Sequence, residues 1–145
     1  MTKPDAKTAE RHLIAYASTM PQAWEDHPWD HTVLKVGKKI FVFFGGAAAP
    51  QDVLSVTVKL PVSYEMALTL PYMRPAGHGL WKGGWAQLTQ SSGDDIDLET
   101  IEGWIVQSYR AVAPKKLAKL VEYKTTTAAD PERALSPAML GERLP

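Results

Sequence analysis

The 145-residue chain contains no cysteine, and this absence excludes disulfide bonds, thiolate metal ligands and cysteine nucleophiles together. A long apolar run is also missing. The longest, residues 40–49, includes two glycines and is far shorter than the ~20 residues that span a bilayer. The first residues are charged and small, without the apolar core of a secretory signal. We therefore expect a cytoplasmic protein without membrane contact.

An excess of one charge is missing too. Sixteen Lys and Arg residues balance sixteen Asp and Glu residues, so no overall field draws the chain toward nucleic acid or an anionic membrane. Any electrostatic function must be local. The length suits one hydrophobic core. We expect a single domain over residues 1–123 and a loosely packed tail over residues 124–145, where the periodic pattern ends.

Two amphipathic helices are predicted near the ends of this domain. Apolar side chains recur every three or four residues over residues 6–20, and a second stripe of this spacing covers residues 97–113. Asp97 is placed to cap the free amide groups of the second helix. Shorter helical segments are predicted at residues 63–70 and 115–123.

Between the helices the apolar period changes to two, which predicts strands. Residues 34–36 and 39–44 form a hairpin whose turn begins with Gly37, and residues 53–59 alternate apolar and polar side chains. Residues 41–44 are all apolar, which predicts coverage on both faces. With a further strand near residue 85, we expect an α+β domain. Its twisted antiparallel sheet of four or five strands packs against the N- and C-terminal helices.

Five short motifs stand in order along most of the chain. They are Pro28-Trp29-Asp30, the hairpin at 33–41, Ser55-Val56-Thr57-Val58-Lys59-Leu60-Pro61, Gly83-Gly84-Trp85 and Gln107-Ser108-Tyr109-Arg110. Together they resemble the MmcQ/YjbR family of small bacterial proteins. The resemblance implies a frataxin-like fold, and some members are labelled DNA-binding through a proposed double-wing arrangement. It carries over no catalytic residues. The glycine-rich form of residues 77–85 suggests a subgroup of the family.

Local lysine clusters support a first hypothesis, nucleic-acid binding. Residues 33–60 hold four lysines and one aspartate, a net charge of +3, and such clusters supply the phosphate contacts that dominate non-specific affinity. The turn pairs Lys35 with Ile40, which places Lys35 and Lys39 on opposite faces. Solvated surface charge is the simpler interpretation. The contact residues of this hypothesis are Lys35, Lys38, Lys39, Lys59 and Lys82.

Tryptophans beside glycines support a second hypothesis, a small-molecule groove. The glycines are not a dinucleotide fingerprint, because the gap from Gly79 to Gly83 is one residue too long. Burial of the indoles in the core is the simpler expectation. A protein-interaction module is a third possibility. The residues of the groove would be Trp29, His78, Trp81 and Trp85.

We expect no metal, cofactor or catalytic site. His27 and His31 are four residues apart, as metal ligands on one helix face are, but Pro28 disfavours a helical conformation at His27. Ser108 lies within a helical stripe and lacks the turn that presents a nucleophile. The sequence therefore favours a monomeric, non-enzymatic binding protein whose partner is DNA, an unknown protein or a small molecule.

Overall fold

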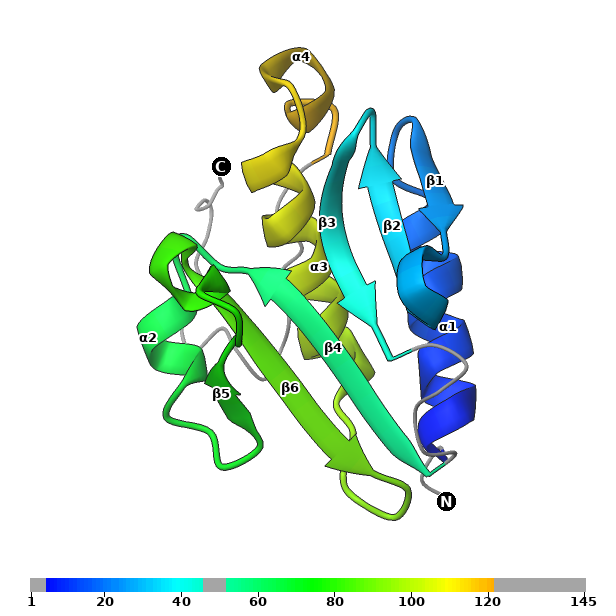
Figure 1. Cartoon of the computed structure of the whole chain (residues 1–145), viewed down its shortest axis with the longest axis vertical. Coiled ribbons are helices and arrows are strands. Elements are labelled where there is room, and N and C mark those ends of the chain that lie inside the picture. Colours follow the sequence, from blue (N-terminus) through cyan, green and yellow to red (C-terminus); the bar gives the residue numbers. More distant parts are fainter. Residues whose placement is uncertain (1–4, 46–51, 122–145) are drawn as a thin grey trace.

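Six strands form one antiparallel sheet in the order β1-β2-β3-β4-β6-β5 (Figure 1). The computed structural model describes residues 5–45 and 52–121, so the predicted tail at 124–145 and its boundary at residue 123 lie outside the described residues. The strands are β1 (Ala23–Asp26), β2 (Thr32–Val36), β3 (Lys39–Phe44), β4 (Val53–Lys59), β5 (Met73–Pro75) and β6 (Trp85–Ser91).

Two long helices cover one face of this sheet, and in the described part of the chain neither lies on the opposite face, which is called the uncovered face below (Figure 1). They are α1 (Ala6–Ser18) and α3 (Leu98–Val112), and both pack on β4. Within the described residues no helix is long and apolar enough to cross a membrane. The short helical elements are α2 (Tyr64–Ala67), α4 (Lys115–Ala118) and the 3-10 turns η1 (Pro28–Asp30) and η2 (Leu80–Gly83).

The core lies between the sheet and the two long helices. Val56 of β4 and Leu13 of α1 are buried there with Ile105 of α3, so the predicted helical stripes and the apolar phase of β4 are confirmed. Tyr109 is fully buried, and its ring meets Phe41 edge to face with centroids 5.1 Å apart. The α+β class and the antiparallel sheet between N- and C-terminal helices are thus as expected.

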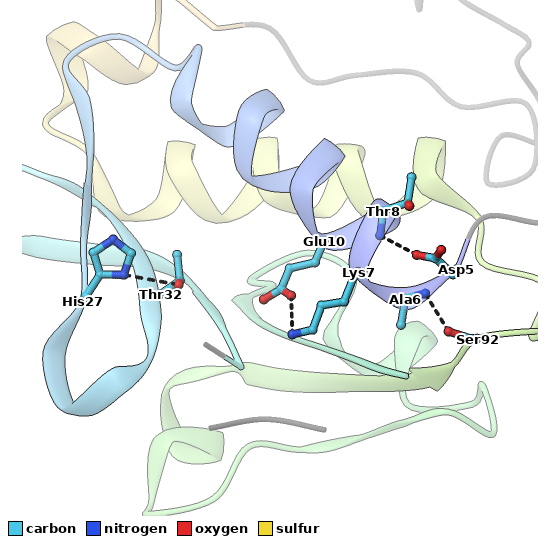
Figure 2. Close-up of polar contacts among 8 residues, drawn as sticks. All are labelled: Asp5, Ala6, Lys7, Thr8, Glu10, His27, Thr32 and Ser92. Atoms are coloured by element: carbon cyan, nitrogen blue, oxygen red, sulfur yellow. Dashed lines mark hydrogen bonds and ion pairs between the residues drawn. The ribbon is translucent and has the colours of Figure 1, made fainter. Parts of the chain in front are cut away.

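The first turn of α1 is fixed to the far end of β6 (Figure 2). The carboxylate of Asp5 accepts a hydrogen bond from the Thr8 amide at 2.7 Å, and this bond lowers the pKa of Asp5. The Ala6 amide donates to the Ser92 hydroxyl at 2.9 Å. Two free amides of the helix start are therefore satisfied, which places the N-terminus of α1 beside the loop that leads into α3.

Two features of the sheet differ from the sequence prediction. There are six strands instead of four or five, because β1 and β5 pair as short edge strands. Coverage of residues 41–44 on both faces is also wrong. The register shift between β2 and β3 lets Phe41 and Val42 both face the core. Phe43 lies on the uncovered face of the sheet and is only half-buried.

Candidate functional site

A row of directly paired side chains crosses the uncovered face of the sheet from β2 to β5. Directly paired residues share a face, and Thr57 alternates along β4 with the buried Val56 and Val58, so the row points away from the core. It is apolar on β2 and β3 and polar on the three strands beyond them. Its members are Val33, Phe43, Thr57, Gln87 and Arg74.

A cavity of about 510 Å³ lies over this row, within the range of about 300–1,000 Å³ usual for small-molecule sites. One wall is the segment around η1, including Trp29 and His31. The opposite wall comes from the loop before η2, including Gly77 and His78. The floor is formed by strand residues, and Phe44, Gly45 and Leu80 also border the cavity. The side chains of the floor are Val33, Ile40, Phe43, Ser55, Thr57 and Gln87.

The polar half of the floor is an ordered hydrogen-bond chain. Arg74 Nε donates to Gln87 Oε1 at 3.2 Å, and Gln87 Nε2 donates to Ser55 Oγ at 3.1 Å. Because a guanidinium group only donates, it fixes the direction of the Gln87 amide. Ser55 Oγ is therefore an acceptor within the protein, and its own hydrogen can point into the cavity. The hydroxyl of Thr57 makes no hydrogen bond within the described part of the chain.

Strained backbone marks both rims of the cavity. Trp29 has φ 50° and ψ 41°, and the residue is 90% exposed. Asp30 follows with φ 65°, and His78 on the opposite rim has φ 57°. Left-handed conformations are uncommon for residues other than glycine, and such strain clusters at ligand-binding sites. His31 Nδ1 lies 3.2 Å from the Trp29 carbonyl, which can only accept, so this nitrogen carries the hydrogen.

The structure brings together only part of the predicted groove. Trp29 and His78 line the cavity, but Trp81 and Trp85 do not. Trp85 instead packs edge to face on Phe43, with ring centroids 5.6 Å apart. Burial of the tryptophans in the core is wrong for all three. Trp29 and Trp81, which is 49% exposed, belong to the two 3-10 turns, and Trp85 is half-buried against Phe43 on the uncovered face.

Sequence reasoning missed the floor of the cavity. Ser55 and Thr57 are the polar phase of the alternation in β4, and this was the one available signal that they face away from the core. Gln87 gave no such signal, since its role depends on Arg74 of a strand that the sequence did not predict. Phe43 lies in a run of apolar residues, so the sequence shows no alternation that would assign it to one face of the sheet.

The five lysines predicted to contact nucleic acid do not form one group. Lys35 Nζ lies 2.8 Å from Asp26 Oδ2 and 5.1 Å from the ring centre of Trp24, so its charge is already paired. The hydrogen bond from Lys35 also lowers the pKa of Asp26. The other four lie toward one end of the sheet, at the hairpin turn, the end of β4 and η2: Lys38, Lys39, Lys59 and Lys82.

The hairpin turn and α4 lie at one end of the molecule, and α1 and α3 begin at the other (Figure 1). The two ends carry opposite excess charge. At the end with the hairpin turn, α4 adds Lys115, Lys116 and Lys119. The opposite end, where α1 and α3 begin, carries Asp5, Asp52, Asp94, Asp95, Asp97 and Glu99. The acidic groups at helix starts and Lys119 at the end of α4 complement the helix dipoles, whereas Lys115 and Lys116 stand at the start of α4, so only part of the separation has a structural cause.

The histidines near residue 30 have protein partners. His27 Nε2 lies 3.0 Å from Glu25 Oε2, and its Nδ1 lies 3.4 Å from the Thr32 hydroxyl (Figure 2). Among the described residues, no group of three or more His, Asp and Glu side chains could hold a metal ion. The histidines that face the cavity are a different pair, His31 and His78.

A model of the YjbR family matches residues 18–111. The chain belongs to the YjbR family. The resemblance predicted from the motifs is therefore confirmed, and the matched segment contains every residue of the cavity floor. A comparison with curated proteins finds no match.

Two solved structures share the fold of this YjbR-family chain. The Deinococcus radiodurans protein DR2400, with a DUF419 domain, is 20% identical, with a TM-score of 0.59 over 94% of this chain and 91% of that one. A Pseudomonas syringae protein is also 20% identical, with a TM-score of 0.55 over 70% of this chain and 96% of its own. At such low identity the likeness concerns the fold.

Proposed function

We propose that this YjbR-family chain is a non-enzymatic protein that binds a small organic molecule on the uncovered face of its sheet. The cavity of about 510 Å³ between the rims at Trp29 and His78 carries this proposal. Its volume suits one small molecule, and its lining combines an apolar majority with a few oriented polar groups, as ligand sites do. The strained rim residues give further support, because a protein gains nothing in stability from them.

A fragment screen by two-dimensional amide NMR tests this function. We expect some small molecules to shift the amide signals of Ser55, Thr57 and Gln87 together. Thr57→Phe fills the cavity from an outward strand position that favours an aromatic side chain, so it should abolish these shifts. Lys39→Phe is the matched control, since Lys39 is an exposed strand residue outside the cavity. A library that shifts none of the floor amides would contradict the proposal.

The basic end of the molecule favours a second candidate function, nucleic-acid binding. Lys38, Lys39 and Lys59 lie at this end with the lysines of α4, and a cluster of this kind neutralises phosphates and releases counterions. The helix dipoles account for part of the cluster. They do not account for the lysines of the hairpin turn, which belong to no helix.

Titration of labelled duplex and single-stranded DNA at two salt concentrations tests this second candidate. Phosphate contacts predict affinity that falls steeply with salt, with a slope smaller by about 0.9 for each contact removed from duplex DNA. Replacing Lys38, Lys39 and Lys59 by alanine should weaken binding. Lys35→Ala is the control, because the Lys35 ammonium is already paired with Asp26. Absence of binding at low salt would exclude this function.

A further inference from the structure

The floor of the cavity is divided into two halves of different chemistry. On β2 and β3 it consists of Val33, Ile40 and Phe43, which offer only apolar surface. On β4 and β6 it consists of Ser55, Thr57 and Gln87. A molecule that fills the cavity must therefore be apolar at one end and polar at the other, and its orientation is set by the sheet.

The polar half can offer three hydrogen-bond donors at once. The Gln87 oxygen faces Arg74, and one Nε2 hydrogen goes to Ser55, which leaves the second Nε2 hydrogen without an acceptor among the described residues. Ser55 Oγ accepts that bond, and within the same described residues its hydroxyl hydrogen has no acceptor either. The hydroxyl of Thr57 can add a third donor. The complementary group on a ligand is an acceptor with several lone pairs, such as a carboxylate.

The lining of the cavity does not repel a negative ligand group. No carboxylate is among the described residues that line it, and the imidazoles of His31 and His78 stand on its two sides. Asp30 is an exposed neighbour of His31 but lies outside the lining. The guanidinium of Arg74, directly behind the Gln87 amide, adds positive charge on the polar side.

The apolar half suits a flat ring. Phe43 lies in the floor, and Trp29, an exposed residue of the lining, belongs to η1 directly before β2. Aromatic rings pack favourably in edge-to-face or offset contacts. Resting on the ligand function proposed above, we propose that the cavity binds a small aromatic acid. Its ring lies over Phe43, and its acidic group accepts hydrogen bonds from Ser55, Thr57 and Gln87.

Two isosteric probes separate this inference from the broader function. 2-Naphthoate and 2-naphthamide have the same ring and shape, but the amide replaces one acceptor oxygen with a donor. Isothermal titration calorimetry of the full chain at neutral pH should show naphthoate binding at least about tenfold tighter, since hydrogen bonds to a charged acceptor are stronger than those to a neutral one. This comparison needs no variant and cannot be confused by misfolding.

Variants of the floor residues then test which side chains bind the acidic group of the ligand. In Ser55→Ala/Thr57→Val the naphthoate dissociation constant should rise about tenfold, because two donors are lost, while that of naphthamide, whose single neutral acceptor oxygen makes weaker bonds, should rise less. Thr89→Val is the control, since Thr89 is an exposed threonine on β6 outside the cavity. Circular dichroism verifies that each variant is folded.

The outcomes distinguish the two proposals. The aromatic-acid inference is overturned if both probes bind with equal affinity, or if the preference for naphthoate persists in the double variant. The cavity then remains a ligand site. If neither probe binds while other fragments shift the floor amides, the ligand class is again wrong. If no small molecule shifts these amides, the ligand function and the inference fail together.

Discussion

The hydroxyl of Ser108 on α3 donates to the carbonyl of Phe41 on β3 at 2.5 Å. The same oxygen accepts a hydrogen bond from the Lys59 amide of β4 at 2.9 Å. The β3–β4 ladder ends one step earlier, at the pair Val42 and Val58, so a helix side chain connects the two strands where they no longer pair. Ser108 is fully buried, and water cannot take its place.

Removing this hydroxyl should destabilise the protein. We expect Ser108→Ala to lower the free energy of unfolding by about 2–4 kcal/mol, because each buried backbone group left unpaired costs about 1–3 kcal/mol. Urea denaturation followed by circular dichroism measures the change. Ser18→Ala is the control, since the Ser18 hydroxyl bonds the Ile14 carbonyl at an exposed position. A loss at Ser108 no larger than at Ser18 would show that the bridge is not needed.

Tyr109 should give the stability a dependence on alkaline pH. Its hydroxyl donates to the Pro21 carbonyl at 2.6 Å, and burial raises the pKa of the phenol. Tyr109→Phe should cost about 1 kcal/mol at neutral pH. A raised pKa stabilises the fold fully below the unfolded value of about 10, and this contribution is lost as pH rises through the folded pKa. The difference in the free energy of unfolding between the wild type and Tyr109→Phe should therefore become smaller above pH ~10.

Denaturation of both proteins from neutral to alkaline pH measures this narrowing. Tyr72, whose pKa is also raised by burial, is present in both, so its contribution cancels. A difference that stays constant or grows with pH would contradict the assignment of the effect to Tyr109.

The N-terminal cap of α3 is the third feature whose removal should destabilise the protein. Asp97 Oδ1 accepts from the Thr100 amide at 3.1 Å, and Oδ2 accepts from the Thr100 hydroxyl at 2.8 Å. We expect Asp97→Ala to cost about 1 kcal/mol, as loss of a helix cap usually does. Asp95→Ala, an exposed position of the same acidic segment, should be close to neutral in the same thermal or urea measurement. Equal losses at the two positions would point to overall charge rather than capping.

The elements that the sequence predicted best are those whose own pattern decides their burial. The alternation of Val53–Lys59 and the stripe of Leu98–Val112 were both recognised, and Asp97 was identified as the cap. The edge strands Ala23–Asp26 and Met73–Pro75 were missed. Such short strands are defined by the neighbour with which they pair, and a proline is tolerated there because an edge has free positions.

The candidate site was predicted only in part for a related reason. Trp29 and His78 stand out in a sequence because large or titratable residues near glycine and proline are conspicuous. Gln87 becomes part of a site only through its register with Thr57 and Arg74, and register is a property of the assembled sheet. The frataxin-like character implied by the family resemblance stays a prediction.

The strain at Trp29 allows a test in which stability and binding change in opposite directions. Trp29 has a left-handed backbone, and the residue is 90% exposed, so removing the ring loses little buried surface. Glycine relieves the left-handed conformation, whereas alanine keeps it at a cost of about 1–2 kcal/mol. We therefore expect Trp29→Gly to be at least as stable as the wild type and about 1 kcal/mol more stable than Trp29→Ala.

Urea denaturation and 2-naphthoate calorimetry on both variants complete the test. Both should bind more weakly than the wild type, because each lacks the indole on the rim. Trp24 is an exposed tryptophan in the extended strand β1. Here the glycine variant should be less stable than the alanine variant, since glycine weakens a strand. If Trp29→Gly and Trp29→Ala are equally stable, the backbone at this position stores no strain. If both keep full affinity, the strained tryptophan has another purpose than contact with the ligand.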